Sequence, residues 1–334
     1  MKRDNLNRRG FLKNAGLLAT SIGVLDGAYS FKKAENIKKG TSVKIGWITD
    51  LHHGYCADAQ SRLETFIHEA GQRKLDFILQ GGDFCHPTAE AKPFLDVWGR
   101  FQGEKHHVLG NHDMDKGTKQ QIMDMWGMKK KYYSFDKGDF HFIVLDCNYI
   151  LKDGQYVDYA NSNYYIARQN RDLINPEQIE WLKADLAKTD KQCIIISHQA
   201  FDEIWGGYGV PNRLDVRKVI DDANNRTDFQ KVIACFCGHH HVDDHSYINK
   251  VHYFQMNSVS YYYVGDGFGS DGSKAMYKDP LFAFVTIDSA GKITIEGKKS
   301  QFLSPTPLEK KHVDAARISA SISSKKEQFN SKLE

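Results

Sequence analysis

The sequence predicts an α/β fold in which mixed β-sheet is layered with helices. Strand-like apolar runs alternate with helical segments over the first two-thirds of the chain, and the last third consists mostly of strands. Short polar clusters rich in Asp and His follow several of these runs directly. Such an order of elements favours one layered domain over separate domains. The 334 residues are enough for one large domain.

Strands are predicted where short apolar runs end at polar or turn-forming residues. They lie at 43–49, 75–80, 105–109, 132–135, 140–145, 193–197, 232–237, 246–248, 251–256, 282–288 and 293–296. Helical spacing of apolar residues or a proline in a first turn predicts helices instead. These helices lie at 57–74, 175–186 and 213–224.

The first thirty residues have the features of a twin-arginine signal peptide. Arg8 and Arg9 precede an apolar run at 15–25, and Ala28 and Ser30 offer small side chains at the two positions that a signal peptidase reads. The run is too short for a permanent membrane span, and no nearby cysteine offers a lipid anchor. We therefore expect the twin-arginine machinery to export the protein to the periplasm or the medium, with no stable membrane anchor. A cytosolic amphipathic helix is the alternative.

The remaining chain is predicted to comprise a catalytic domain at 31–303 and a Ser/Lys-rich tail at 304–334. Without residues 1–30, the 45 basic and 42 acidic residues become 40 and 40, so net charge gives no indication of a nucleic-acid partner. The six cysteines allow fifteen complete disulfide pairings. Four of them lie in or beside apolar runs, which favours burial as small apolar residues.

Five polar clusters follow predicted strands directly. They are Asp50-Leu51-His52-His53, Gly81-Gly82-Asp83, Gly110-Asn111-His112-Asp113, Ser197-His198 and Gly238-His239-His240-His241. Open α/β sheets place their sites at the carboxyl ends of strands. On an extended segment, side chains two residues apart point the same way, so Asp50 and His52 can bind one ion while His240 points away from His239. One such cluster is more often a cap than a metal ligand, but five together indicate a metal site.

The order of these clusters resembles the calcineurin-like metallophosphoesterase superfamily, whose pattern is D-x-H, G-D, G-N-H-D/E, a lone His and G-H-x-H. The resemblance covers residues 43–260. It implies a four-layer α/β/β/α sandwich of two mixed sheets, with a dinuclear metal site at the carboxyl ends of the strands. The implied ligands are Asp50, His52 and His241 for one metal and Asn111, His198 and His239 for the other, with Asp83 bridging. His112 matches the family's histidine that faces the substrate without binding metal.

These residue types suit the hydrolysis of a phosphate ester. Mixed oxygen and imidazole ligands suit two divalent ions of Mn, Fe or Zn, with manganese favoured, and disfavour calcium. Two such ions carry four positive charges, of which two aspartates balance two. The remaining charge attracts a phosphate and lowers the pKa of a bridging water, giving a nucleophilic hydroxide near neutral pH. His112 is the expected general acid, and Asp113 is expected to hold its tautomer.

Departures from subfamily patterns narrow the expected substrate. The residues after Asp83 lack the arginine of the G-D-x-x-D-R-G run in serine/threonine protein phosphatases, and His86 stands where purple acid phosphatases have a tyrosine ligand. The layout is more similar to class III cyclic-nucleotide phosphodiesterases and manganese-dependent ADP-ribose/CDP-alcohol diphosphatases. That resemblance implies a small-molecule substrate, namely a phosphodiester or pyrophosphate of a nucleotide-like compound.

Two alternatives stay open. A broad-range, alkaline-phosphatase-like phosphomonoesterase would use the same centre, and a metal-bearing binding protein without turnover would keep its ligands but need no acid. Aromatic residues in the segments 200–212 and 261–272 could stack on a nucleobase or simply pack against the protein.

Overall fold

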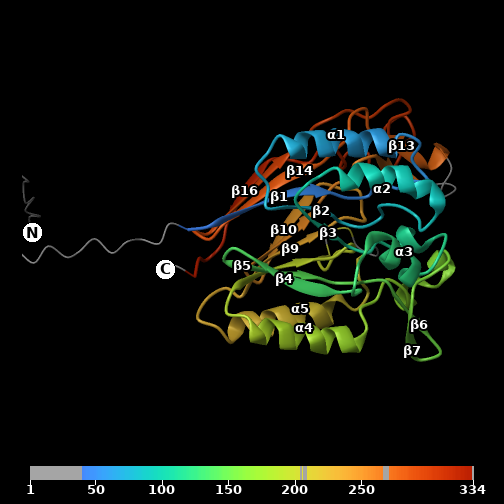
Figure 1. Cartoon of the computed structure of the whole chain (residues 1–334). Coiled ribbons are helices and arrows are strands. Elements are labelled where there is room, and N and C mark those ends of the chain that lie inside the picture. Colours follow the sequence, from blue (N-terminus) through green and yellow to red (C-terminus); the bar gives the residue numbers. More distant parts are fainter. Residues whose placement is uncertain (1–39, 204, 206–208, 266–270, 333–334) are drawn as a thin grey trace, which may run out of the picture. The chain divides into compact units, whose positions relative to one another are not determined.

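A computed structural model of the chain describes residues 40–203, 205, 209–265 and 271–332 (Figure 1). These residues belong to one unit, Gly40–Glu334. The predicted signal peptide at 1–30 lies outside the described residues, as do Tyr208 and part of the glycine-rich segment after Gly265. Within the described residues, no helix combines the length and the apolar character needed to cross a membrane.

The first large sheet has six strands in the order β16-β15-β14-β1-β2-β3. Their bounds are β1 Ser42–Ile48, β2 Phe77–Gln80, β3 Glu104–His107, β14 Ala283–Asp288, β15 Lys292–Gly297 and β16 Lys325–Gln328. The strands β1, β2 and β3 are parallel, whereas β14, β15 and β16 join antiparallel to one another and to β1. The carboxyl ends of β1, β2 and β3 therefore lie at one edge of this sheet.

The second large sheet also has six strands, in the order β10-β11-β9-β8-β5-β4. Their bounds are β4 Tyr133–Lys137, β5 Phe140–Val144, β8 Gln192–Ile196, β9 Val232–Cys237, β10 Asp244–Ile248 and β11 Val251–Gln255. Four central strands are parallel, and the edge strands β4 and β10 are antiparallel to their neighbours. Both sheets are therefore mixed, as the sequence predicts.

Helices cover the outer face of each sheet. The apolar residues of α1 (Ala59–Gly71) and α2 (Lys92–Gly99) pack in one cluster with Ile48, Ile78 and Phe284 of the first sheet. Those of α4 (Pro176–Lys188) and α5 (Arg213–Asn225) pack with residues of β5, β8 and β9. Figure 1 shows the two helix pairs on opposite sides, with the sheets between them. The predicted four-layer α/β/β/α sandwich is confirmed.

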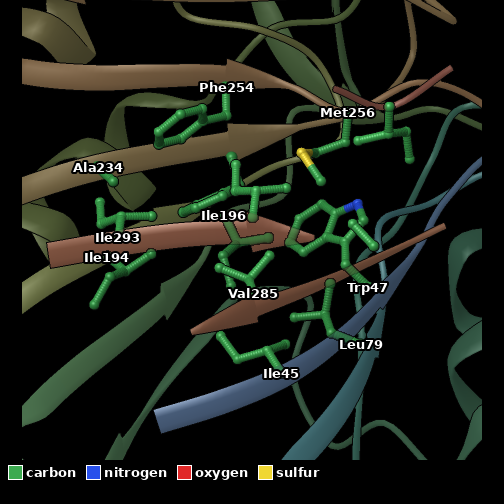
Figure 2. Packing of buried hydrophobic residues seen from close by; sticks show 14 of the residues in the cluster. Ile45, Trp47, Leu79, Ile194, Ile196, Ala234, Phe254, Met256, Val285 and Ile293 are labelled. Carbon is green, nitrogen blue, oxygen red and sulfur yellow. The ribbon is translucent and has the colours of Figure 1, made fainter. Parts of the chain in front are cut away.

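The inner faces of the two sheets form the largest apolar cluster. Trp47 and Leu79 of the first sheet lie against Ile194, Ile196 and Phe254 of the second, as Figure 2 shows. Each of these side chains is at most 2% exposed. A fully buried side chain of this size stabilises the fold by roughly 1.5–3 kcal/mol. This packing fixes how the strand ends of the two sheets face each other.

Smaller elements extend from the sandwich. They are α3 (Lys119–Trp126) and the hairpins β6 (Tyr149–Lys152) with β7 (Gln155–Asp158) and β12 (Tyr261–Tyr263) with β13 (Lys274–Met276). Helix α3 begins with a capping box, in which the Thr118 hydroxyl accepts the Gln121 backbone N–H, and ends at Gly127 in the left-handed conformation. The sequence prediction missed α2, α3 and both hairpins.

The segment 304–334 differs from the predicted tail. Its last strand, β16, pairs with β15, and Ile322 and Phe329 are buried in the cluster between the sheets. Residues 313–317 form turns. Its composition is polar because β16 is an edge strand that buries few side chains, so the boundary at 303 does not separate the end of the chain from the domain.

Candidate dinuclear metal centre

The predicted ligands occupy loops that leave the carboxyl ends of five strands. Asp50 and His52 follow β1, Asp83 follows β2, and Asn111 lies four residues after β3, all in the first sheet. From the second sheet, His198 follows β8 and both His239 and His241 follow β9. Because the inner faces of the sheets pack together, these loops meet at one edge of the sandwich.

Asp50, His52 and His241 form a first group. Their ligand atoms all lie within 4.8 Å of one another. The Nε2 atoms of His52 and His241 are 3.0 Å apart, and His241 Nε2 is 3.2 Å from Asp50 Oδ1. All three side chains are buried. This is the predicted ligand set of the first metal.

Asp83, His198 and His239 form a second group with ligand atoms within the same 4.8 Å limit. His198 Nε2 lies 3.0 Å from Asp83 Oδ2, and the same Asp83 oxygen lies 3.8 Å from His52 Nε2 in the first group. Asp83 therefore lies between the two groups, where a bridging carboxylate belongs. Asn111, the remaining predicted ligand, is buried, and its Oδ1 is 3.5 Å from the amide nitrogen of Gln199.

The backbone at five of the seven predicted ligands is left-handed. The φ angles are 55° at Asp50, 53° at His52, 52° at Asp83, 69° at His239 and 54° at His241. Positive φ is uncommon for residues other than glycine and is concentrated at functional sites, because surrounding structure must offset its cost of about 1–3 kcal/mol. The chain therefore bends at these positions to turn side chains of both sheets toward one point.

Glycines beside the ligands leave room for this convergence. A Cβ on Gly110 would lie 2.2 Å from the backbone nitrogen of Asp83, and one on Gly82 would lie 2.4 Å from His198 Nδ1. A Cβ on Gly238 would lie 2.5 Å from Asp50 Oδ2. No side chain larger than hydrogen fits at these contacts without displacing a ligand.

Hydrogen bonds orient the imidazole rings. His198 Nδ1 donates to the Gly81 carbonyl at 2.8 Å, and His241 Nδ1 donates to the Tyr261 carbonyl at 2.7 Å. Each bond places a proton on Nδ1 and leaves Nε2 to bind a metal, as metal-ligating histidines commonly do. Asp50 accepts the Thr49 hydroxyl at 2.7 Å. The orientation of the rings is therefore set by groups outside the centre.

The charges of the centre favour a cation. Burial opposes protonation of His198, but the carboxylates of Asp83 and Asp50 raise its pKa to about 10. Burial, together with the neighbouring His241, lowers the pKa of His52 well below its ordinary value. His52 Nε2 and His241 Nε2 face each other at 3.0 Å, so a proton or a metal ion must lie between them. The nitrogen and oxygen donors present fit divalent transition metals.

His112 lies beside the metal groups, and its partner is Asp115. Its ring centroid is 5.4 Å from that of His52, and its Nδ1 is 2.6 Å from Asp115 Oδ2. Burial opposes protonation, but the carboxylates of Asp83 and Asp115 raise the pKa of His112 to about 9. The imidazole therefore carries a proton near neutral pH.

The Asp113 carboxylate does not hold the His112 ring, in contrast to the prediction. Its carboxylate accepts the backbone N–H groups of Asp83, Phe84, Cys85 and Gly110 at 2.6–3.1 Å. The prediction that Asp113 holds the His112 tautomer is wrong, because Asp113 instead ties the loop after β2 to the loop after β3. Its role is to position Asp83 and Asn111.

Sequence reasoning missed several polar side chains around His112. The hydroxyls of Tyr55 and Tyr159 donate to Asp115 at 2.9 and 3.3 Å. His86 is buried, and its ring is 4.7 Å from that of Tyr55. Burial and the charge of Lys116 lower the pKa of His86 to about 4. Only the position of Asp115, three residues after His112, signalled any of these contacts in the sequence.

The aromatic residues of the two predicted loops are mostly packed. Tyr261 and Tyr262 are buried, and the Tyr261 ring lies 5.2 Å from His52 and 4.9 Å from His241. Trp205 donates to Asp244 at 2.6 Å and lies under the Arg317 guanidinium. The structure therefore favours packing over base stacking for these side chains. His53, which follows His52 in the first cluster, is partly exposed and stacks on Phe94.

Comparison with known proteins agrees with this centre. Residues 43–243, more than half of the chain, match the family model described as calcineurin-like phosphoesterase. Purple acid phosphatase 15 of Arabidopsis thaliana is 22% identical over an alignment of 196 residues that covers 53% of this chain and 32% of that protein. The chain thus spans about a third of the length of this curated relative.

Solved structures share the fold. A dimetal phosphatase from Danio rerio superposes with a TM-score of 0.56 at 14% identity, covering 76% of this chain and 95% of that one. GAP50, the anchor in the inner membrane complex of Plasmodium, gives a TM-score of 0.53 at 14% identity, with 87% and 89% covered. The purple acid phosphatase PPD1 of yellow lupin gives 0.50 at 13% identity, with 88% and 55% covered.

The family match and the converging ligand groups identify a metal-dependent phosphoester hydrolase domain. Six of the seven predicted donor side chains converge from both sheets in two groups, the arrangement that a dinuclear centre needs. The chain belongs to the calcineurin-like phosphoesterase family.

Proposed function

We propose that this protein hydrolyses a phosphodiester or pyrophosphate bond of a nucleotide-like small molecule, with His112 as the general acid. The observation that carries the proposal is the hydrogen bond of 2.6 Å from His112 Nδ1 to Asp115, beside two groups of metal ligands. A leaving alkoxide or phosphate oxygen needs a proton, and a protonated imidazole at this position can donate it.

In this proposal the two ligand groups bind metal, and His112 with its partners transfers the proton. A pair of divalent ions, when bound, activates water as a nucleophile and offsets negative charge on the phosphoryl oxygens. The Asp83 carboxylate contacts His198 of the second group and lies near His52 of the first. The two groups are therefore close enough to act on one phosphate. Asp115 holds the His112 ring through Nδ1, which leaves Nε2 as the atom that delivers the proton. Tyr55 and Tyr159 hold Asp115 in turn.

Two cationic side chains near the centre support a substrate with more than one negative group. Lys116 is exposed, and its charge lowers the pKa of His86, which lies beside His112. Arg168 is one of the charges that lower the pKa of His239 in the second ligand group, and it also forms an ion pair of 3.5 Å with Asp172. They come from separate segments of the chain, the turn after β3 and the 3-10 helix Arg168–Asn170. A pyrophosphate extends its charge over two phosphoryl groups, and cations from separate segments can contact both.

A phosphomonoester is the second candidate, favoured by the similarity to a purple acid phosphatase and to a fold neighbour described as a dimetal phosphatase. The same ligand groups would bind a terminal phosphate. His86 follows the Gly82-Asp83 motif in place of a tyrosine, so we propose manganese, or iron or zinc, without a tyrosine ligand at that position.

The two candidates predict opposite substrate preferences. Protein reconstituted with Mn, Fe, Zn or Mg should hydrolyse bis-para-nitrophenyl phosphate, cyclic nucleotides or nucleotide diphosphate conjugates with a higher kcat/KM than para-nitrophenyl phosphate or sugar phosphates. The measurement is a hydrolysis panel with each metal. Faster turnover of the monoesters would reject the diester proposal, and no turnover with any metal would favour a binding protein.

A further inference from the structure

A third group of potential ligands lies outside the catalytic centre. Among the described residues, the ligand atoms of His245, His252 and Glu327 all lie within 4.8 Å of one another. His245 is on β10, His252 on β11 and Glu327 on β16. β10 and β11 belong to the second sheet, whereas β16 is the edge strand of the first. The group therefore joins two sheets that share no strand pairing.

The two imidazoles are arranged to face each other. His252 Nε2 lies 2.9 Å from the Gln328 carbonyl oxygen, which can only accept, so Nε2 carries the proton and Nδ1 presents a lone pair. That Nδ1 is 3.0 Å from His245 Nε2. The other nitrogen of His245, Nδ1, is 3.8 Å from Glu327 Oε1. His245 Nε2 can donate its N–H to this lone pair as a hydrogen bond, and a metal ion could take the place of that proton.

A similar pair of imidazoles, one of them bonded to a backbone carbonyl, occurs in the candidate catalytic centre of this chain. There, His241 donates one ring N–H to a backbone carbonyl and turns its other nitrogen toward His52 at 3.0 Å. A carboxylate belongs to each group, but Asp50 lies 3.2 Å from the same His241 nitrogen that faces His52, whereas Glu327 lies nearest to His245 Nδ1 and not to the Nε2 that faces His252. Metal-ligating histidines commonly donate the N–H of their other ring nitrogen to a backbone carbonyl, which fixes the tautomer.

The surroundings hold the rings in place and leave access from solvent. The rings of His245 and His252 stack on Phe254 at 4.6 and 5.7 Å with interplanar angles of 11° and 12°. The His252 residue is 4% exposed, whereas the side chains of His245 and Glu327 are 19% and 30% exposed. The nearby Lys325 forms an ion pair with Asp243, which offsets its charge. An ion could therefore enter from the side of Glu327.

We propose that His245, His252 and Glu327 bind one zinc ion, with water as the fourth ligand. Zinc takes imidazole nitrogens at about 2.0–2.1 Å and carboxylate oxygens at about 2.0–2.2 Å, so two ligand atoms at a tetrahedral angle lie roughly 3.4 Å apart. The 3.0 Å between the two ring nitrogens needs only a small opening to reach this value. The ion fastens β16, the last strand of the chain, to the edge of the second sheet.

Metal counting on the full chain tests the site. After zinc loading and desalting, the wild type should hold one more zinc per chain than the variants His245→Ala and Glu327→Gln. His68→Ala, which removes an exposed histidine from α1, should match the wild type. Because the readout is a difference between proteins, it does not depend on turnover or on how many ions the catalytic centre holds.

A second measurement reports on β16 itself. In hydrogen exchange, zinc should slow the backbone amides of 325–328 in the wild type but not in Glu327→Gln, which keeps the size of the side chain. Equal zinc content in the wild type and both variants would overturn the proposal. So would a zinc effect on these amides that persists in Glu327→Gln.

Discussion

His112 and Asp115 show how a short helical turn pairs residues that are not neighbours in the sequence. The segment His112–Met114 is a 3-10 helix, and in this conformation side chains three positions apart lie in line. Asp115 therefore lies beside His112, while Asp113 points back toward the backbone of the preceding loop. The acid pair depends on this local geometry as well as on residue types.

Replacement of His112 and of its partner should separate proton donation from ring orientation. We expect His112→Ala to lower kcat by about 10²–10⁴-fold with unchanged metal content, since positioned acid catalysis supplies a factor of that size. The raised pKa of His112, about 9, means that the acid form is present below that pH and is lost above it. Asp115→Asn removes one of the carboxylates that raise this pKa. The loss of activity on the alkaline side should therefore begin at a lower pH in this variant than in the wild type.

The measurement is kcat across pH for each variant. Asp124→Asn, at an exposed position of α3, should follow the wild-type profile. An Asp115→Asn profile that superposes on the wild type would contradict the role given to Asp115.

The candidate ligands could be named from their order along the chain, but their backbone conformation was not predictable. Asp50, His52 and Asp83 adopt positive φ although they are not glycines, and no local pattern announces it. Packing of the surrounding loops imposes the conformation, since the strain is offset only after the two sheets meet. The carboxylate of Asp115 was missed for a related reason, because adjacency in the sequence favoured Asp113.

At the scale of elements, long periodic segments were predictable and short polar ones were not. The helix expected at 213–224 is α5 (Arg213–Asn225), and the strand at 232–237 is β9. Helix α3 has eight residues, of which only Lys119, Ile122 and Met123 are buried, so it lacks an apolar face long enough to recognise. Edge strand β16 alternates partly buried and exposed residues and carries two lysines.

The end of the chain should contribute to stability, in contrast to a free tail. Phe329 is 6% exposed and packs on Phe140 with ring centroids 6.3 Å apart. Phe329→Ala should therefore lower the free energy of unfolding by about 3 kcal/mol, the lower end of the range for a buried phenylalanine. Urea denaturation measures this change as a lower midpoint.

A matched substitution in the same segment provides the control. Val313 is 91% exposed, so Val313→Ala should change the free energy of unfolding by less than about 0.5 kcal/mol. Equal midpoints for the two variants would mean that the segment does not pack in solution.

At the scale of the whole molecule, metal affinity should depend on pH in a defined direction. The pKa of His198 is raised to about 10 in the metal-free centre, so this ligand holds a proton at neutral pH that an incoming ion must displace. Affinity should rise by about tenfold per pH unit between pH 6 and 9 for one displaced proton.

Competition with a chelator at several pH values measures the affinity, and calorimetry in buffers of different ionisation heat measures the released proton. His68→Ala should show the same pH dependence as the wild type. A flat affinity over this range would show that no bound proton competes for the centre.

The division of ligands between the sheets has a mechanical meaning. Asp50 and His52 come from the first sheet while their partner His241 comes from the second, and Asp83 likewise faces His198 across the sandwich. Neither sheet alone supplies a complete ligand group. A displacement of one sheet past the other by about 1 Å would disturb the distances within both ligand groups at once. Misplacement on that scale can slow a reaction about a hundredfold. The interdigitated side chains around Trp47 thus keep the two sheets, and with them the two ligand groups, in register.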